Sequence, residues 1–274
     1  MTCPSSPSSP PAPTLRQAAL AVLAQPDPAA KAALARALPL EAPCGEDELI
    51  AEPPGLPGRP ASPQLVPHVK LKQRSMNTLE GRATLIHALT HIELNAIDLA
   101  VDVVWRFPGM PPAFYQQWAV VAQEEALHFQ LLRAHLQSMG YDYGSFPAHN
   151  GLWEMASKTR HDLLARLALV PRTLEARGLD ASLPVKAKLV GAGDLRAGEI
   201  LDVILRDEIG HVAVGNRWFR VLCERAALEP VATYADLAAR YEAPRLRGPF
   251  NLEARRQAGF DEDELAALLQ APKL

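Results

Sequence analysis

Two segments decide the fold: QEEALH at residues 123–128 and RDEIGH at residues 206–211. In each segment a glutamate stands three residues before a histidine, Glu125 before His128 and Glu208 before His211. In a helix this spacing places both side chains on one face, one turn apart, where a carboxylate and an imidazole can bind one metal ion. One such pair arises readily by chance. Two pairs, each near the middle of a long predicted helix where buried charge is costly, indicate a metal site.

The sequence around these motifs favours long helices. Helical patterns cover about residues 77–106, 112–140, 151–171 and 195–227. Pro171 must kink or restart the third helix, and GLDASLP at residues 178–184 has the composition of a turn before a further helical stretch that ends near Gly191. Strand-like alternation is almost absent between residues 76 and 227. Because helices of this length are typical of an up-and-down bundle, the sequence predicts an all-α protein with a four-helix bundle over residues 76–228.

A four-helix carboxylate site needs one further glutamate from each of the other two helices. Glu93 and Glu175 meet this need, since both lie in the pattern apolar-Glu-x-x-x-apolar-Asp. Glu93 precedes Glu125 by 32 residues and Glu175 precedes Glu208 by 33, so the chain contains two helix pairs repeated at 82–83 residues. Pro171 precedes Glu175 by four residues, and a helix broken there could displace this ligand. The predicted metal ligands are Glu93, Glu125, His128, Glu175, Glu208 and His211.

The ligand types also predict the metal. Four carboxylates and two imidazoles suit two iron ions, or alternatively two manganese ions, better than zinc, which prefers fewer ligands in a tetrahedral arrangement. The four negative charges would offset those of two divalent ions. Without metal, the buried acids should destabilise the bundle or take up protons.

The motifs also carry a resemblance to a known family. The segments concerned are HIELNAIDLA (91–100), EEALHF (124–129), LEARGLD (174–180) and ILRDEIGH (204–211). They resemble a bacterial ferritin-like family of unassigned function in the ferritin-like di-iron superfamily, which is similar to the di-iron hydroxylase that modifies isopentenyl-type adenosine in tRNA. The resemblance covers about residues 15–260. It implies a ferritin-like bundle with a di-iron or di-manganese centre, and it implies no particular substrate.

Proline divides the rest of the chain into regions. Fifteen of the 25 prolines lie in the first 67 residues, and residues 1–13, rich in proline and serine, are predicted to be a disordered tail. Residues 14–75 are predicted to form short helices and a proline-rich connector packed on the bundle. Residues 229–274 are predicted to form a C-terminal helical extension. Its basic loop, residues 244–256, is either a solvated loop or a lid over a site.

Several polar residues near the motifs have open roles. Glu124 and Asp207 occupy matching positions directly before two predicted ligands. Surface or structural roles are favoured for both, and orientation of a histidine is the alternative. His91 is a weaker candidate for a ligand or a proton relay, and Tyr143 for a redox-active neighbour of the metals.

The composition excludes several classes of protein. The chain has 274 residues, of which 48% are hydrophobic and 22% charged, as is ordinary for a globular protein. A net charge of −3 argues against a globally basic nucleic-acid-binding protein. Three widely spaced cysteines cannot form a disulfide framework or a zinc ribbon, which favours a cytoplasmic location. No run of 18 apolar residues predicts a membrane span, and the first residues do not resemble a signal peptide.

The predicted site is compatible with three functions. The first is an oxygen-activating oxidoreductase or hydroxylase that uses O₂, an unidentified electron donor and an unidentified small-molecule or modified-nucleoside substrate. The second is a ferroxidase or another metal-handling or peroxide-detoxifying protein. The third is a structural site in which a metal only stabilises the bundle. Of these, the oxygenase should have a pocket that leads to the metals. A homodimer is expected from the amphipathic helices.

Overall fold

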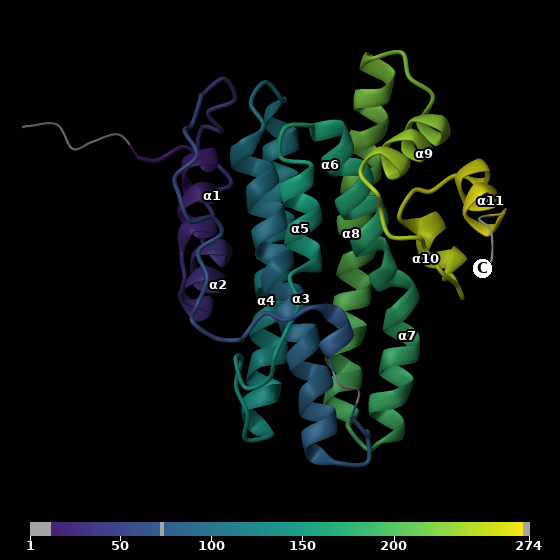
Figure 1. The fold of residues 1–274 in the computed structure, drawn as a ribbon. Coiled ribbons are helices and arrows are strands. Elements are labelled where there is room, and N and C mark those ends of the chain that lie inside the picture. Colours follow the sequence, from purple (N-terminus) through teal and green to yellow (C-terminus); the bar gives the residue numbers. More distant parts are fainter. Residues whose placement is uncertain (1–11, 72–73, 271–274) are drawn as a thin grey trace, which may run out of the picture.

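Helices make up the regular structure of this protein. The computed structural model describes residues 12–71 and 74–270 (Figure 1). Within these ranges it has no strand, apart from one isolated bridge between Leu65 and Ala148. The predicted all-α class is therefore confirmed. The predicted tail, residues 1–13, lies almost entirely outside the described residues.

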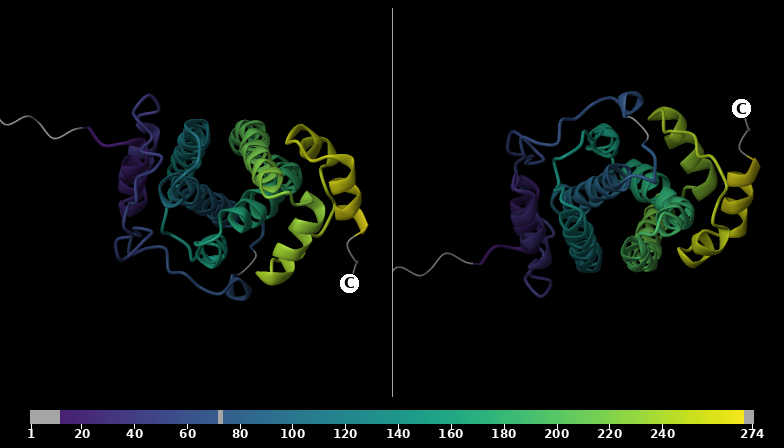
Figure 2. Two further views of the ribbon diagram at one scale, coloured as in Figure 1. Left: turned by 90° about the horizontal axis from the view of Figure 1, so that it is seen from above. Right: turned by 90° about the horizontal axis from the view of Figure 1, so that it is seen from below.

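Two pairs of long helices form the centre of the molecule, as the end-on views in Figure 2 show. The first pair is α3 (Leu79–Arg106) and α4 (Pro112–Ser138). The second pair is α8 (Leu195–Arg225) and a composite helix built from α6 (Leu163–Leu169), a π-helical segment (Val170–Glu175) and α7 (Ala176–Gly191). This arrangement confirms the predicted helical bundle.

Local sequence sets where the bundle helices begin. The Thr78 hydroxyl accepts a hydrogen bond from the Gly81 amide (3.1 Å) at the start of α3, and the Asp194 carboxylate accepts one from the Ala197 amide (3.0 Å) at the start of α8. Such caps satisfy backbone donors that the first helical turn leaves free. Pro112, the first residue of α4, has no backbone N–H, but an N–H at this position would have no partner within the helix.

The third bundle helix differs from its prediction. Residues 151–158 form a separate short helix, α5 (Gly151–Lys158), and α6 begins only after Asp162, which caps it. Pro171 interrupts the regular α-helix without ending the helical stretch, because it lies in the π-helical segment between α6 and α7, whose wider turns accommodate a residue that lacks a backbone donor. The expected turn at residues 178–184 is wrong, since this stretch lies within α7. Burial of Leu179 against the neighbouring elements outweighs the turn-like composition.

Apolar packing occupies both ends of the bundle. One cluster joins the N-terminal parts of α3 and α8 with the C-terminal part of α4, through residues such as Ile86, Ile204 and Leu132. A larger cluster fills the other end around Trp118 and Phe219. Each fully buried apolar side chain stabilises the fold by about 1.5–3 kcal/mol. The charged motifs lie between these two clusters along the helices.

The N-terminal region covers the outer side of the first helix pair. Helices α1 (Leu15–Ala24) and α2 (Pro28–Arg36) lie against α3 and α4 (Figure 1). The buried Arg16 guanidinium donates hydrogen bonds to the carbonyls of Trp105 (2.5 Å) and Glu48 (2.6 Å). Lys31 forms a buried ion pair with Asp98 of α3. In residues 37–71 and 74–78, the connector that follows is irregular apart from the short 3-10 helix His68–Lys70.

The C-terminal region lies against the second helix pair. It contains α9 (Pro230–Arg240), α10 (Leu252–Gln257) and α11 (Glu262–Gln270). The expected loop at residues 244–256 is a loop only in its first part, because α10 takes the remainder. The Arg255 guanidinium donates two hydrogen bonds to Asp180 of α7 and so fixes α10 to the bundle. None of the helices described is both long and apolar enough to cross a membrane.

Candidate metal centre

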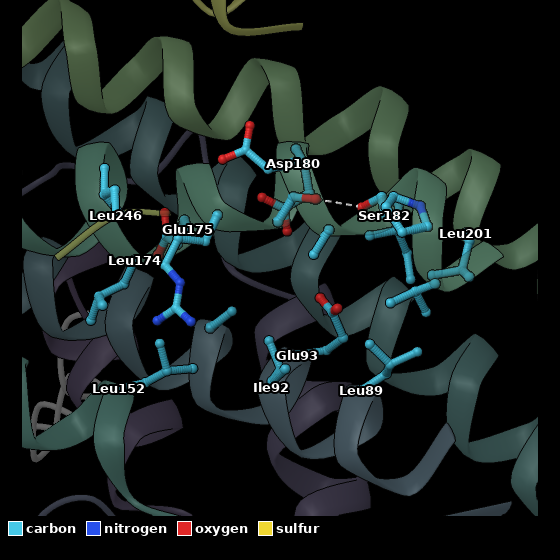
Figure 3. A pocket seen from close by; sticks show the side chains of 18 of the residues that line it. Leu89, Ile92, Glu93, Leu152, Leu174, Glu175, Asp180, Ser182, Leu201 and Leu246 are labelled. Carbon is cyan, nitrogen blue, oxygen red and sulfur yellow. Dashed lines mark hydrogen bonds between the residues drawn. The ribbon is translucent and has the colours of Figure 1, made fainter. Parts of the chain in front are cut away.

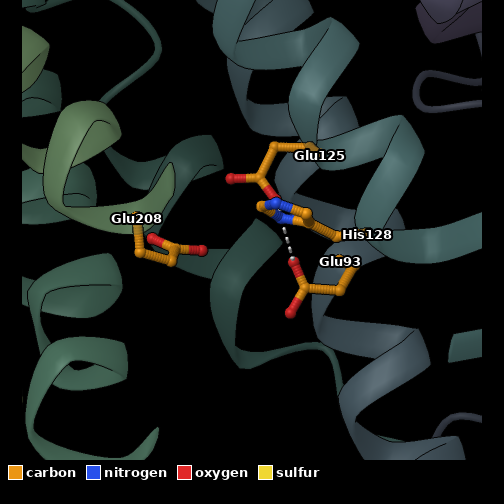
Figure 4. A group of neighbouring side chains, drawn as sticks. All are labelled: Glu93, Glu125, His128 and Glu208. Carbon is orange, nitrogen blue, oxygen red and sulfur yellow. Dashed lines mark hydrogen bonds and ion pairs between the residues drawn. The ribbon is translucent and has the colours of Figure 1, made fainter. Parts of the chain in front are cut away.

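Three helices bring four of the predicted ligands together. Glu93 comes from α3, Glu125 and His128 come from α4, and Glu208 comes from α8 (Figure 4). One carboxylate oxygen from each glutamate and one ring nitrogen of the histidine all lie within 4.8 Å of one another, and all four residues are buried. The helical spacing inferred from the sequence therefore does place Glu125 and His128 on one face, toward the partner helices.

His211 lies at the edge of this group. Its Nδ1 atom is 2.9 Å from Glu125 Oε1 and 3.9 Å from Glu208 Oε2. The ring is 1% exposed, so these atoms interact in an interior with little solvent screening. The second Glu-x-x-His motif thus faces the same point as the first.

Glu175 approaches the cluster from the end of the π-helical segment. It lines the same cavity as Glu93 and Glu208. Burial raises the pKa of its carboxyl to about 8, and the charges of Glu125 and Glu93 add to this effect. Glu175 is therefore close enough to interact with the other carboxylates, although it lies outside the group of four that meet within 4.8 Å. Pro171 does not turn this glutamate away from the centre.

Two further carboxylates hold the histidines in place. His211 Nε2 lies 2.8 Å from Glu124 Oε2, and His128 Nε2 lies 3.1 Å from Asp207 Oδ2. The pairing crosses between the helices, because the carboxylate before each Glu-x-x-His motif binds the histidine of the other motif. Both Nδ1 atoms are left facing the cluster. These contacts favour the alternative role, orientation of a histidine, for both Glu124 and Asp207. The matching positions of these residues in the two motifs were the signal for this shared role.

The charges of the metal-free cluster are strongly perturbed. Burial would lower the pKa of His128, but its interactions with the Glu125 and Glu93 carboxylates outweigh burial and raise it to about 12. Burial raises the pKa of Glu93 to about 7, and it also raises that of Glu208 well above its usual value. For Glu125, the charge of His211 and the hydrogen bond from His128 outweigh burial and hold the pKa below its usual range. Metal-free, the cluster holds protons that metal ions would replace.

The unpartnered atoms of the cluster test whether a metal fits. Nine buried side-chain nitrogen or oxygen atoms among the described residues have no hydrogen-bond partner, and five of them belong to predicted ligands. An unpaired buried polar atom is costly, and most such atoms in folded proteins have partners. The five atoms are Glu93 Oε2, Glu125 Oε1, Glu175 Oε2, Glu208 Oε2 and His211 Nδ1. Glu125 Oε1 and His211 Nδ1 lie 2.9 Å apart as an ion pair, but they are not aligned for a hydrogen bond. Oxygen and imidazole donors of this kind fit two iron or manganese ions.

A cavity of about 480 Å³ opens beside the cluster (Figure 3). Three of the predicted ligands, Glu93, Glu175 and Glu208, form part of its wall. Most of the remaining wall is apolar, with side chains such as Leu89 and Leu201. Residues 246–250 also line the cavity, so the basic loop reaches the site. The position of this loop favours the lid alternative over the solvated loop.

The weaker candidates lie away from the cluster. His91 Nδ1 is 2.8 Å from the Tyr143 hydroxyl, and His91 Nε2 is 2.9 Å from the His149 carbonyl oxygen. Both ring nitrogens of His91 are therefore engaged outside the candidate metal centre. The Tyr143 ring stacks against His87 with ring centroids 5.4 Å apart. These aromatic side chains pack together, and the structure gives them no contact with the predicted ligands.

Together, the fold and the cluster define a class of protein: a helical bundle whose buried carboxylate–histidine cluster borders an internal cavity. The chain belongs to the family described as "Protein of unknown function (DUF455)", whose model matches residues 24–266. It is similar to an "Uncharacterized protein" of Haemophilus influenzae, with 46% identity over 213 residues that cover 75% of this chain and 74% of the relative. No solved structure matches the chain significantly. The resemblance to a family of unassigned function is thus confirmed, while membership of the ferritin-like di-iron superfamily stays a prediction.

Proposed function

We propose that this protein is a dinuclear metal carboxylate protein of the ferritin-like type, and that it acts as an oxygen-activating oxidoreductase. Two iron ions, or two manganese ions as the alternative, would be held by Glu93, Glu125, His128, Glu175, Glu208 and His211. The observation that carries the proposal is that buried ligand atoms without a hydrogen-bond partner lie beside a largely apolar cavity. When bound, the metal ions would supply the redox chemistry by which O₂ oxidises an organic substrate.

The side chains around the centre have distinct tasks in this proposal. The four glutamates offset the positive charges of the metal ions and bind them through oxygen. Glu124 and Asp207 fix the orientation of the two imidazoles by binding the Nε2 atoms, and they leave Nδ1 of each ring directed to the metals. The apolar part of the cavity keeps bulk water away from a reactive centre.

The cavity also bears on the alternatives. A ferroxidase or a purely structural site needs metal ligands but has no use for an organic pocket of this size. A volume of about 480 Å³ lies within the range of about 300–1,000 Å³ that is typical of small-molecule sites. The structure therefore supports hydroxylation or a related oxidation of a small molecule or a modified nucleoside, with an electron donor that is still to be identified.

Elemental analysis tests the metal centre directly. The protein would be purified from cultures supplemented with iron and manganese, next to the double variant Glu125→Ala/His128→Ala. The matched control is Glu199→Ala/His161→Ala, which removes the same chemical groups from exposed positions outside the cluster. We expect about two metal ions per chain in the wild type and the control, as in other four-helix carboxylate sites. The double variant should contain almost none.

A second measurement separates the functions. An oxygenase should consume O₂ when a reductant is supplied, whereas a ferroxidase should turn over added Fe²⁺. A structural site should accept zinc as well as iron and should lose only stability when it is emptied. Absence of metal, or a single zinc ion that the double variant retains, would contradict the dinuclear centre.

A further inference from the structure

The cavity beside the cluster has two chemically different ends. Its inner end is formed by the buried carboxylates of Glu93 and Glu208. Its middle is apolar: Ile92, Leu174 and Leu201 all face it (Figure 3). At the outer end the wall contains exposed polar side chains instead. A ligand that fills the cavity must therefore be apolar along most of its length.

The outer end carries positive charge. Arg177 of α7 and Arg247 of the 246–250 loop line the cavity and are exposed. Within the described part of the chain, neither guanidinium makes a hydrogen bond or an ion pair with a protein group. Among the described residues of the wall, Asp180 is the only carboxylate besides the predicted ligands. It is already engaged, since it accepts hydrogen bonds from Arg255 and from the Asn251 amide. The two arginines are thus left as free cations at the mouth.

The fold holds Arg247 at this position. The loop that carries it joins α9 to α10, and α10 is attached to α7 immediately afterwards. The Asn251 amide donates to Asp180 Oδ1 (2.9 Å), and Arg255 Nη2 donates to Asp180 Oδ2 (2.6 Å). Because Asp180 lies three residues after Arg177 on α7, this anchor keeps the backbone that leads to Arg247 close to the part of α7 that carries Arg177. Positive charge at the mouth is a consequence of the packing of the C-terminal region.

We infer that the substrate of this site is an amphiphile, with an apolar body that reaches toward the carboxylate cluster and a carboxylate or phosphate head that Arg177 and Arg247 bind at the mouth. Guanidinium groups pair with both kinds of head through charge-assisted hydrogen bonds. This inference rests on the proposed function for the position of the reacting centre. The recognition itself depends only on the cavity and the two arginines.

Binding of four simple probes tests the inference by titration calorimetry. Decanoate and decyl phosphate carry the two expected heads, decanol is neutral, and decyltrimethylammonium has the opposite charge. The full-length protein is used as purified, and its metal content is measured in the same sample. We expect both anionic probes to bind at least tenfold more tightly than the cationic probe. The anionic probe that binds more tightly identifies the preferred head group, carboxylate or phosphate.

Charge reversal at the mouth provides the second arm. Arg177→Glu/Arg247→Glu should weaken decanoate binding about tenfold or more and leave decanol binding almost unchanged. The matched control, Arg225→Glu/Arg240→Glu, reverses two exposed charges away from the cavity and should bind decanoate like the wild type. Equal binding of decanoate and decanol, no binding of any probe, or no effect of the charge reversal would overturn the inference. A protein that contains the metals but binds no anionic probe would refute the substrate class alone, and one that binds decanoate but contains no metal would refute the proposed centre alone.

Discussion

Replacement of Glu175 by glutamine should stabilise the metal-free protein while it weakens metal binding. The carboxyl is buried near Glu125 and Glu93, which together with burial raises its pKa to about 8 from the ordinary value of 4.5. Between these two pH values the folded state holds a proton that the unfolded state has released. The free energy of unfolding must therefore fall as the pH rises from 4.5 to about 8, and it levels off above that pH.

The size of the effect follows from the same shift. One pKa unit corresponds to about 1.4 kcal/mol, so the carboxyl costs the folded state about 3 kcal/mol at pH 7 and less than about 1 kcal/mol at pH 5. Glutamine has nearly the same shape and does not ionise. The metal-free Glu175→Gln variant should therefore be more stable than the wild type, and this difference in the free energy of unfolding should grow by about 2–3 kcal/mol from pH 5 to pH 7.

Urea unfolding of chelator-treated protein, followed by circular dichroism at several pH values, measures this difference. Glu199→Gln makes the same change at an exposed position and should show almost no pH-dependent gain. With metal added, the order should reverse, because the wild type gains the binding energy of a complete ligand set. A Glu175→Gln difference that is the same at pH 5 and pH 7 would show that this carboxyl ionises freely, and it would remove the argument that Glu175 faces the other carboxylates.

Three further predictions follow from the contacts of the site. Asp207→Asn should weaken metal affinity about 10–100-fold in a chelator competition, because it removes the charge that orients His128, and unchanged affinity would contradict that role. Metal uptake near pH 7 should release protons, since the pKa of His128 is about 12 in the metal-free state; affinity should therefore fall with falling pH, and calorimetry in buffers of different ionisation enthalpy would count the protons. Gly215→Ala should destabilise the fold by about 1–3 kcal/mol in urea, because its Cβ would lie 2.5 Å from Pro171 Cβ, whereas Gly210→Ala, with nothing within 4 Å of the new Cβ, should be neutral or stabilising.

The parts of the structure that the sequence predicts correctly depend on local helical geometry. Glu125 and His128 share a face because three residues make almost one helical turn, whatever the rest of the chain does. The long helices α3, α4 and α8 begin and end near the residues expected from capping residues, proline and glycine. The repeat of about 82 residues then suffices to predict which other glutamates approach the same point.

The parts that the sequence does not predict depend on contacts between distant segments. The π-helical segment is allowed because Gly215 of α8 lets Pro171 approach closely, and the Thr173 hydroxyl of the segment donates to the Ala168 carbonyl of α6. Residues 178–184 form a helix because neighbouring elements bury one side of it. The pairing of Glu124 with His211 of the other motif likewise depends on how close α4 and α8 lie, and the local sequence pattern does not predict that distance.

The repeat extends beyond the ligands to the attachment of the flanking regions. In both halves an aspartate follows the first glutamate by five residues, Asp98 after Glu93 and Asp180 after Glu175. Asp98 forms its buried ion pair with Lys31 of the N-terminal region, and Asp180 forms its ion pair with a C-terminal arginine of α10. Each flanking region is thus fixed to the helix that carries one single-glutamate ligand, little more than one turn away from that ligand. Removal of one partner of a buried ion pair costs about 3–5 kcal/mol, because the other charge is left buried without a partner. The N-terminal and C-terminal regions are therefore attached by equivalent ion pairs, one to each half of the candidate metal centre. The attachment at Asp180 also positions the loop that lines the cavity.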